Sequence, residues 1–245
     1  MNHPNVFSHV GIEPIALPYY NASTHALDAD ALTAAIVALP RQSVIVLQTS
    51  GNNPTGCDPT PSEWRMLAQT FRACGHFAFL DVAYLGFVSG SADVDCEAIH
   101  IFVEAKVPLL VAATYGKAFG LYGERVGILS VTAPSAPVAE RIEKQMKLLA
   151  RAETGAMPAF GAKILETILG DAEMKRVWED DLRNMAGQFV ERRAKLKDLL
   201  DGLGTLGNWN FIKEQVGMFT WVLRLLPDFG MLTARQVHRV LSSAN

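Results

Sequence analysis

The stretch that decides the fold runs over residues 114–127 and reads TYGKAFGLYGERVG. Apolar runs stand on both sides of it, at residues 107–113 (VPLLVAA) and 126–131 (VGILSV), and each has the composition of a short buried strand. Lys117 is therefore predicted to lie in a glycine-rich loop between two buried strands. A lysine in apolar surroundings has a depressed pKa, so that its amine can act as a nucleophile.

Two further side chains in this stretch indicate an anion site. Thr114 offers a hydroxyl donor and Arg125 a guanidinium fork, and the two together suit a phosphate group. An amine beside a phosphate site is the arrangement that pyridoxal phosphate needs to form a Schiff base. The alternative is a solvated surface loop in which Arg125 pairs with Glu124, and this stretch alone does not decide between the two.

Composition and charge exclude several classes of protein. The chain has 245 residues, of which 49% are hydrophobic and 19% charged, and this predicts a folded globular protein with a large core. A net charge of −3 gives no reason to expect nucleic acid or a membrane as a partner, and no apolar run is long enough to span a bilayer. The cysteines, Cys57, Cys74 and Cys96, are too few for a disulfide framework and lack metal-ligand spacing. We therefore expect no metal site and a reducing compartment, by default the cytoplasm.

Strand and helix patterns alternate along the first half of the chain. Strands are expected at residues 12–20, 43–48 and 76–80, and helices at residues 28–39, 60–74 and 96–104. The second of these helices opens with a capping box formed by Thr60 and Glu63. Such alternation predicts an α/β fold with a mostly parallel sheet, in which ligands bind at the carboxyl ends of the strands. Asn53, Asp81 and the Lys117 loop are expected to meet at that edge.

The second half of the chain is predicted to be mostly helical. Helices are expected at residues 136–150, 162–169 and 171–203, a loop at residues 151–161, and a strand at residues 214–223. The first five residues read as a polar turn and resemble neither a signal peptide nor a transit peptide. We place a domain boundary near Asn184, which divides the chain into a large domain, residues 1–184, and part of a smaller domain, residues 185–245.

Four short motifs point to a known family. They are NPTG at residues 53–56 with DPTP after it, DVAYLGF at residues 81–87, KAFGLYGERVG at residues 117–127, and QVGMF at residues 215–219. In sequence and spacing they resemble the class I pyridoxal phosphate-dependent aminotransferases, aspartate aminotransferases in particular. The resemblance runs in register roughly from residue 2 to residue 219. It implies the fold-type I architecture of these transferases, a mostly parallel sheet flanked by helices with part of a small α+β domain.

The resemblance implies that five residues act on the ring of the cofactor. Lys117 would form the Schiff base and then move the α-proton of the substrate. Asp81, supported by His3, would pair with the pyridinium nitrogen. Asn53 and Tyr84 would bond the phenolic oxygen of the ring.

The resemblance also implies residues for the phosphate and for the substrate. Thr114 and Arg125 would hold the phosphate. Arg151 would reach into the site of a neighbouring subunit and bind the distal carboxylate of aspartate or glutamate. That role implies that the protein works as a homodimer.

Some features depart from the family pattern. The chain begins where the family is already inside its large domain, and it stops before the family's arginine for the substrate α-carboxylate. Ala118 stands where an asparagine is usual. We therefore expect an internal piece of an aminotransferase, truncated at both ends, whose sheet exposes an edge and an apolar face.

The implied activity is transfer of an amino group between aspartate, or a related amino acid, and 2-oxoglutarate, so amino acids and 2-oxo acids are the expected partners. Two alternatives stay open. One is an inactive fragment that only binds the cofactor or a partner chain, which the missing α-carboxylate arginine favours. The other is a pyridoxal phosphate enzyme of different specificity, such as aromatic amino transfer or decarboxylation. The retained Lys117, Asp81 and Arg125 favour an aminotransferase ancestry.

Overall fold

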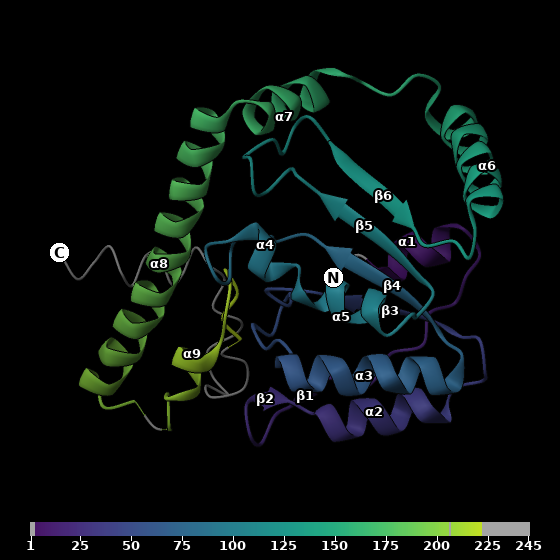
Figure 1. Ribbon diagram of the computed structural model, residues 1–245. Helices are drawn as coiled ribbons and strands as arrows, with labels where there is room; N and C mark the ends of the chain where they lie inside the picture. The colour runs from purple at the N-terminus through teal and green to yellow at the C-terminus, as the bar shows by residue number, and fades with distance from the viewer. Residues whose placement is uncertain (1–2, 206, 222–245) are drawn as a thin grey trace.

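A four-stranded sheet forms the centre of the molecule (Figure 1). The computed structural model describes residues 3–205 and 207–221. The strands lie side by side in the order β3 (Val44–Gln48), β4 (Phe77–Val82), β5 (Leu109–Thr114) and β6 (Gly127–Val131). The first three are parallel, and β6 is antiparallel to β5. The predicted α/β fold with a mostly parallel sheet is confirmed.

Helices cover one face of this sheet. They are α2 (Ala29–Ala38), α3 (Pro61–Cys74) and α5 (Glu97–Glu104), with the short α4 (Ala92–Asp95) before the last. The aromatic rings of Phe71 and Phe102 are fully buried and meet edge to face, with their centroids 5.2 Å apart. They belong to the same core as Leu80 of β4. This core holds α3 and α5 against the sheet, because burying such side chains gives the largest favourable free energy in folding.

The helix α3 shows how local sequence sets an element. Thr60 accepts the backbone N–H of Glu63, and the Glu63 carboxylate accepts the backbone N–H of Thr60, so the predicted capping box is confirmed. Gly75 ends the helix in the left-handed conformation that glycine adopts at little cost. The buried residues of α3 are Trp64, Leu67, Ala68 and Phe71.

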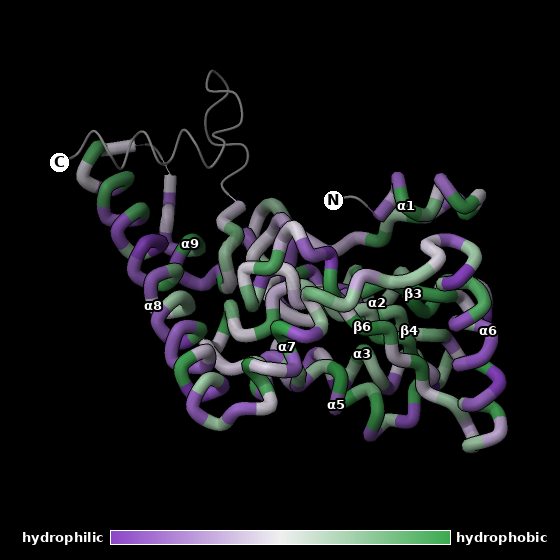
Figure 2. Tube along the Cα trace, turned by 90° about the horizontal axis from the view of Figure 1, so that it is seen from above, coloured by the Kyte–Doolittle hydropathy of each residue, from purple (hydrophilic) through white to green (hydrophobic). Residues whose placement is uncertain are grey.

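Four helices make up most of the described part of the second half of the chain. They are α6 (Ala136–Thr154), α7 (Phe160–Gly170), α8 (Ala172–Gly202) and α9 (Phe211–Glu214). Figure 1 shows α6 and α8 at opposite sides of the sheet. In the view of Figure 2, much of α6 and α8 is hydrophilic, whereas hydrophobic colour gathers on the strands and on α5. The predicted domain boundary near Asn184 falls inside α8 and stays a prediction.

The amino-terminal segment differs from the prediction. Of the polar turn expected over the first five residues, the described residues 3–5 belong to a helix, α1 (His3–His9). The strand predicted over residues 12–20 is found only at its last residue, where β1 (Tyr20–Asn21) begins and pairs with β2 (Ala26–Leu27). Two prolines in the predicted strand have no N–H to donate to a ladder, which accounts for the irregular chain.

The strand predicted at residues 214–223 is wrong for the described residues, which end at Trp221. The helix α9 ends at Glu214, and a loop follows. The Gln215 side chain accepts the backbone N–H of Trp221 at 3.0 Å and donates to its carbonyl at 3.2 Å. These bonds close the segment on itself, and Gly217 turns the chain with φ of +68°. The last two residues of the predicted strand, Val222 and Leu223, lie outside the described residues.

Two further expectations need correction. The strand after the lysine loop was expected to be buried, but β6 is largely exposed, because no element among the described residues covers it. Arg151 was expected in a loop, but it lies in the last turn of α6, which continues to Thr154.

Candidate active site

Polar side chains stand at the carboxyl ends of the parallel strands, on the sheet face opposite to the core. Gln48 of β3 lies opposite Asp81 of β4, and Asp81 lies opposite Ala112 of β5. Alternate side chains of a strand share a face, so Thr114 lies on the same face of β5 as Ala112. Because Ala112 pairs with Asp81, Thr114 and Asp81 extend from the same face of the sheet. Their neighbour Leu80 points the other way, into the core. The parallel topology therefore brings the predicted polar residues to one edge of the sheet.

The carboxylate of Asp81 contacts a histidine from the amino-terminal helix. His3 Nε2 lies 2.9 Å from Asp81 Oδ2, although 78 residues separate the two in sequence. Phe7, one turn further along α1, packs edge to face against Phe79 with their centroids 6.2 Å apart. Phe79 and Asp81 share a face of β4, so the aromatic contact lays α1 over the site and brings His3 to the carboxylate.

The loop after β3 presents Asn53 to the site, and two residues to which the sequence assigned no role, Gln48 and Asp58, hold this loop. The Gln48 side chain accepts the backbone N–H of Asn53 at 2.7 Å. The Asp58 carboxylate accepts the backbone N–H groups of Gly51 at 2.6 Å and Asn52 at 2.8 Å. A polar residue at the end of an apolar strand was the available signal for Gln48. No local pattern marks Asp58 as the partner of this turn.

Tyr84 joins Asn53 to Lys117. The Asn53 amide donates to the Tyr84 hydroxyl at 3.3 Å, and Lys117 Nζ lies 3.9 Å from the centroid of the Tyr84 ring. Tyr84 is buried and meets Phe219 edge to face, with their centroids 5.1 Å apart. An amide, a phenol and an amine from three separate segments thus meet at one place.

Thr114 and Arg125 flank the lysine loop where it leaves β5 and enters β6. The Thr114 hydroxyl donates to the carbonyl of Val126 at 3.4 Å and accepts the N–H of Gly116 at 3.2 Å. Arg125 is exposed, with φ of +52°, and among the described residues it forms no ion pair, so the expected alternative of pairing with Glu124 is not seen. The Thr114 hydroxyl thus bonds to the residue that follows Arg125, and the Arg125 guanidinium is accessible to an anion.

Arg151 is not brought to this cluster. It is exposed near the end of α6, and α6 has no buried residue. Its substrate role in the site of a neighbouring subunit stays a prediction.

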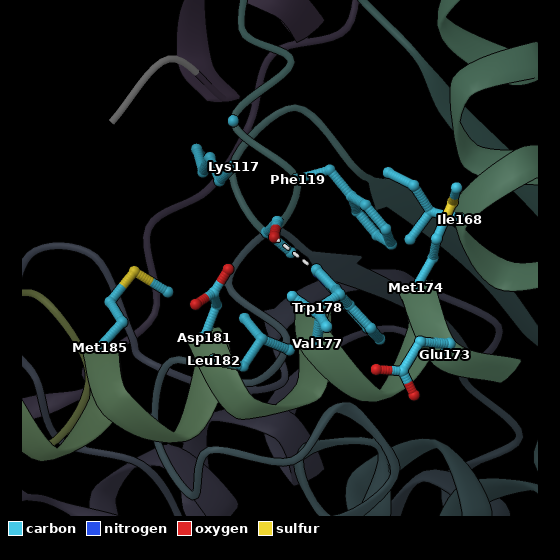
Figure 3. A pocket seen from close by; sticks show the side chains of 12 residues that line it. Lys117, Phe119, Ile168, Glu173, Met174, Val177, Trp178, Asp181, Leu182 and Met185 are labelled. Atoms are coloured by element: carbon cyan, nitrogen blue, oxygen red, sulfur yellow. Dashed lines mark hydrogen bonds between the residues drawn. The ribbon is translucent and has the colours of Figure 1, made fainter. Parts of the chain in front are cut away.

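An apolar hollow of ≈ 590 Å³ adjoins the lysine loop on the side of α8. Figure 3 shows Lys117 and Phe119 above it and a row of α8 side chains below it, including Trp178 and Leu182. The Trp178 indole N–H donates to the carbonyl of Ala118 at 2.9 Å. The sequence predicted only that Trp178 lies in a helix, and its contact with the residue after Lys117 depends on tertiary structure.

Comparison with known proteins decides the family. A family model described as "Aminotransferase class I and II" matches residues 1–241. The chain belongs to this family.

Several relatives of this aminotransferase chain are aspartate aminotransferases. It is 38% identical to aspartate aminotransferase 1 of Medicago sativa over 99% of its own length and 58% of that protein's. It is 40% identical to the cytoplasmic aspartate aminotransferase of Oryza sativa subsp. japonica over 90% of its own length and 54% of that protein's. The chain therefore spans little more than half the length of these relatives.

The architecture of this aminotransferase chain is also found in solved structures. One is an aromatic amino acid aminotransferase from Burkholderia pseudomallei covalently bound to pyridoxal phosphate. The TM-score is 0.89 and the identity 31%, over 96% of this chain and 61% of that one. The likeness confirms the fold-type I architecture that the motifs implied.

The donor set of this aminotransferase chain fits pyridoxal phosphate. The cofactor carries a ring nitrogen, a phenolic oxygen, a carbonyl carbon and a phosphate, and each needs a different chemical partner. The described residues supply a carboxylate held by a histidine, an amide beside a phenol, an amine, and a hydroxyl near a guanidinium. Pyridoxal phosphate is therefore the cofactor that both the family and the chemistry of these side chains support.

The carboxyl of Asp58 makes the Asn53 loop sensitive to pH. Burial raises its pKa from the ordinary value of 3.8 to about 6, although the N–H donors of Asn52 and Gly51 lower it. The folded chain therefore holds this proton more tightly than the unfolded chain. The stability that Asp58 contributes is fully present below about pH 4 and is lost as the pH rises through about 6.

We expect the free energy of unfolding of the unmodified chain, relative to that of Asp58→Asn, to fall by up to about 3 kcal/mol between pH 4 and pH 7. Urea unfolding at a series of pH values measures this difference. Asp30→Asn, at an exposed site in α2, is the matched control and should give a nearly constant difference. A pH-independent difference for Asp58→Asn would contradict the expectation.

Proposed function

We propose that this chain carries out pyridoxal phosphate-dependent transfer of an amino group between aspartate, or a related amino acid, and 2-oxoglutarate. The observation that supports this most directly is the meeting of Lys117, Tyr84 and Asn53 beside the Asp81–His3 pair at the carboxyl ends of the strands. When bound, pyridoxal phosphate supplies an electrophilic carbonyl carbon and a ring that withdraws electrons from the substrate.

Each member of the site has a separate task in this proposal. Asp81, kept in place by His3, would accept a hydrogen bond from the protonated ring nitrogen and so keep that proton on the ring. Asn53 and Tyr84 would bind the phenolic oxygen. Lys117 would bond covalently to the cofactor and, once released by the incoming amino acid, would take and return the proton on the substrate α-carbon.

Thr114 and Arg125 would bind the phosphate in this proposal. A guanidinium gives two parallel donors to phosphate oxygens, and such charge-assisted bonds are stronger than neutral ones. The absence of an ion pair to Arg125 among the described residues supports its availability for this task.

A homodimer is part of the proposal, with Arg151 binding the distal carboxylate of a substrate held by the neighbouring subunit. The support is the surface of α6. This helix buries none of its residues, and even the apolar Leu148 and Leu149 are 63% and 65% exposed. On this largely hydrophilic helix, the two adjacent exposed leucines are the place where a second copy of the chain would pack. Light scattering of the purified chain should give twice the mass of the monomer, and a monomer at every concentration would overturn this part.

The last part of the proposal is that the protein is located in the cytoplasm. Relatives are named as cytoplasmic, mitochondrial and chloroplastic forms, so similarity does not choose the compartment. The unpaired thiols of Cys57, Cys74 and Cys96 support a reducing compartment. Within residues 3–205 and 207–221, no helix has the length and hydropathy to cross a membrane. Cell fractionation tests the location.

The experiment that tests the proposed function is covalent capture of the cofactor. The chain is mixed with pyridoxal phosphate, reduced with borohydride and digested, and the modified peptides are identified by mass spectrometry. We expect one dominant modified peptide, the one that contains Lys117, because that amine lies beside the phenol and amide that bind the ring. Modification spread evenly over surface lysines would overturn the proposal.

A further inference from the structure

The helix α8 contacts both segments that carry the reacting groups. At Trp178 it meets the lysine loop, and at Leu182, four residues later, it meets the turn that carries Tyr84. Residues four apart lie on the same side of a helix, one turn from each other. One rigid turn of α8 therefore spans the distance between the Lys117 loop and the Tyr84 turn.

The contact with the lysine loop has two components. The Trp178 indole N–H donates to the Ala118 carbonyl at 2.9 Å, as the dashed line in Figure 3 shows. The Trp178 ring also stacks on Phe119, with centroids 4.4 Å apart and planes 10° from parallel. Ala118 and Phe119 directly follow Lys117, so the indole fixes the backbone on the carboxyl side of the lysine by a hydrogen bond and a ring contact together.

The contact with the tyrosine turn is tightly packed. Leu182 is 2% exposed and belongs to one cluster with Tyr84 and Phe87. A Cβ at Gly86 would lie only 2.6 Å from Leu182 Cδ1, so α8 approaches the turn as closely as glycine permits. The turn cannot move along α8 without losing this packing. The position of the Tyr84 turn relative to the Trp178 indole is therefore fixed.

We propose that Trp178 is a positioning residue that holds the Lys117 amine over the Tyr84 ring through the Ala118 carbonyl and the Phe119 ring. The effect of this positioning on cofactor capture rests on the proposed function. The positioning of the Lys117 amine by Trp178 does not. Trp178 acts through the lysine loop and does not touch the Lys117 amine in this arrangement. Without it, the glycines of the loop would let the amine leave the ring for water, since Gly120 has φ of +66° and open space around it.

The test observes Lys117 in the cofactor-free chain. Reductive methylation with ¹³C-formaldehyde labels the lysine amines, and the Lys117 methyl signal is assigned by its loss in Lys117→Arg. At 3.9 Å from the centroid of Tyr84, this signal should be shifted upfield by the ring current. Tyr84→Leu, which removes the ring and leaves Trp178 in place, should abolish the shift.

Trp178→Phe is the decisive variant, because phenylalanine retains a stacking ring but has no N–H. We expect the Lys117 signal to move toward those of the exposed lysines while circular dichroism shows a folded chain. Trp209→Phe is the matched control, since the buried Trp209 indole N–H has no hydrogen-bond partner among the described residues. It should leave the Lys117 signal in place. An unmoved signal in Trp178→Phe would overturn the proposal.

A second variant keeps the proposal testable if Trp178→Phe does not fold. Phe119→Leu removes the stacked ring and leaves the indole hydrogen bond, and we expect a smaller movement of the same signal. No movement in Phe119→Leu would overturn the proposal in that case. If both variants fold, their effects should be non-additive, because the two contacts hold one segment.

Cofactor capture separates this proposal from the proposed function. In Trp178→Phe, the rate of borohydride-dependent capture at Lys117 should fall by about tenfold, the equivalent of about 1.4 kcal/mol. If the unmodified chain captures no cofactor at Lys117, the proposed function fails. A Lys117 signal that moves in Trp178→Phe would then still support the positioning role.

Discussion

Lys117→Ala is expected to abolish covalent capture of pyridoxal phosphate by this chain. The reason is position: Lys117 Nζ lies 3.9 Å from the ring centroid of Tyr84, whose hydroxyl accepts the Asn53 amide. Several other lysines are held in ion pairs on helix surfaces, among them Lys147, Lys175 and Lys197. Borohydride reduction followed by measurement of the intact mass gives the extent of capture directly.

Any turnover that the unmodified chain shows should be lost as well, by about 10²–10⁴-fold if the amine moves the substrate proton. Lys163→Ala, at an exposed position in α7, is the control and should capture the cofactor as the unmodified chain does. Equal capture by Lys117→Ala and the unmodified chain would show that another amine holds the cofactor, and would contradict the proposed site.

Gly217→Ala is expected to destabilise the chain by about 2–5 kcal/mol. Gly217 has φ of +68°, which costs an alanine roughly 1–2 kcal/mol, and an added Cβ would lie 2.9 Å from the Cα of Gly51. Two backbones meet at this point, so no flexible side chain can move aside, and overpacking adds about 1–3 kcal/mol. Arg193 of α8 also donates to the Gly217 carbonyl, which resists a shift of the loop.

Urea unfolding measures this effect, and Gly204→Ala separates its two causes. Gly204 has a similar φ of +63°, but an added Cβ would meet nothing within 4 Å. Its substitution should therefore show the backbone strain alone. Equal destabilisation by the two substitutions would mean that the loop at residues 215–219 does not pack on the loop at residues 50–56, and that the site is less closed than described.

The sequence predicted those elements whose causes are local. The α3 helix is an example, because its capping box, its proline and its apolar face all lie within fifteen consecutive residues, 60–74. The same holds for β3 and β4, whose apolar runs are long enough to be buried. The convergence of Asn53 and Asp81 also followed from the sequence, since a parallel sheet places all its strand ends at one edge.

The remaining features depend on contacts between distant segments. No pattern near Trp178 shows that its N–H meets Ala118, sixty residues earlier. The Gln215 side chain bonds the backbone N–H and carbonyl of Trp221, which in a strand would bond to a neighbouring strand. A segment with the composition of a strand therefore folds as a closed loop. Exposure of β6 was missed for a similar reason, because an apolar run indicates that a strand prefers burial and does not indicate what covers it.

The distance in sequence between His3 and Phe219 has a consequence for synthesis of the protein. His3 contacts Asp81, and Phe219 packs against Tyr84, so the first and the last of the described contributions to the site are more than two hundred residues apart. Lys117 precedes Phe219 by 102 residues, and at about 5–20 residues per second a ribosome needs on the order of 5–20 s to add them. The nascent chain is therefore expected to carry Lys117 unprotected during that interval, and to become able to retain the cofactor only after Phe219 has been made.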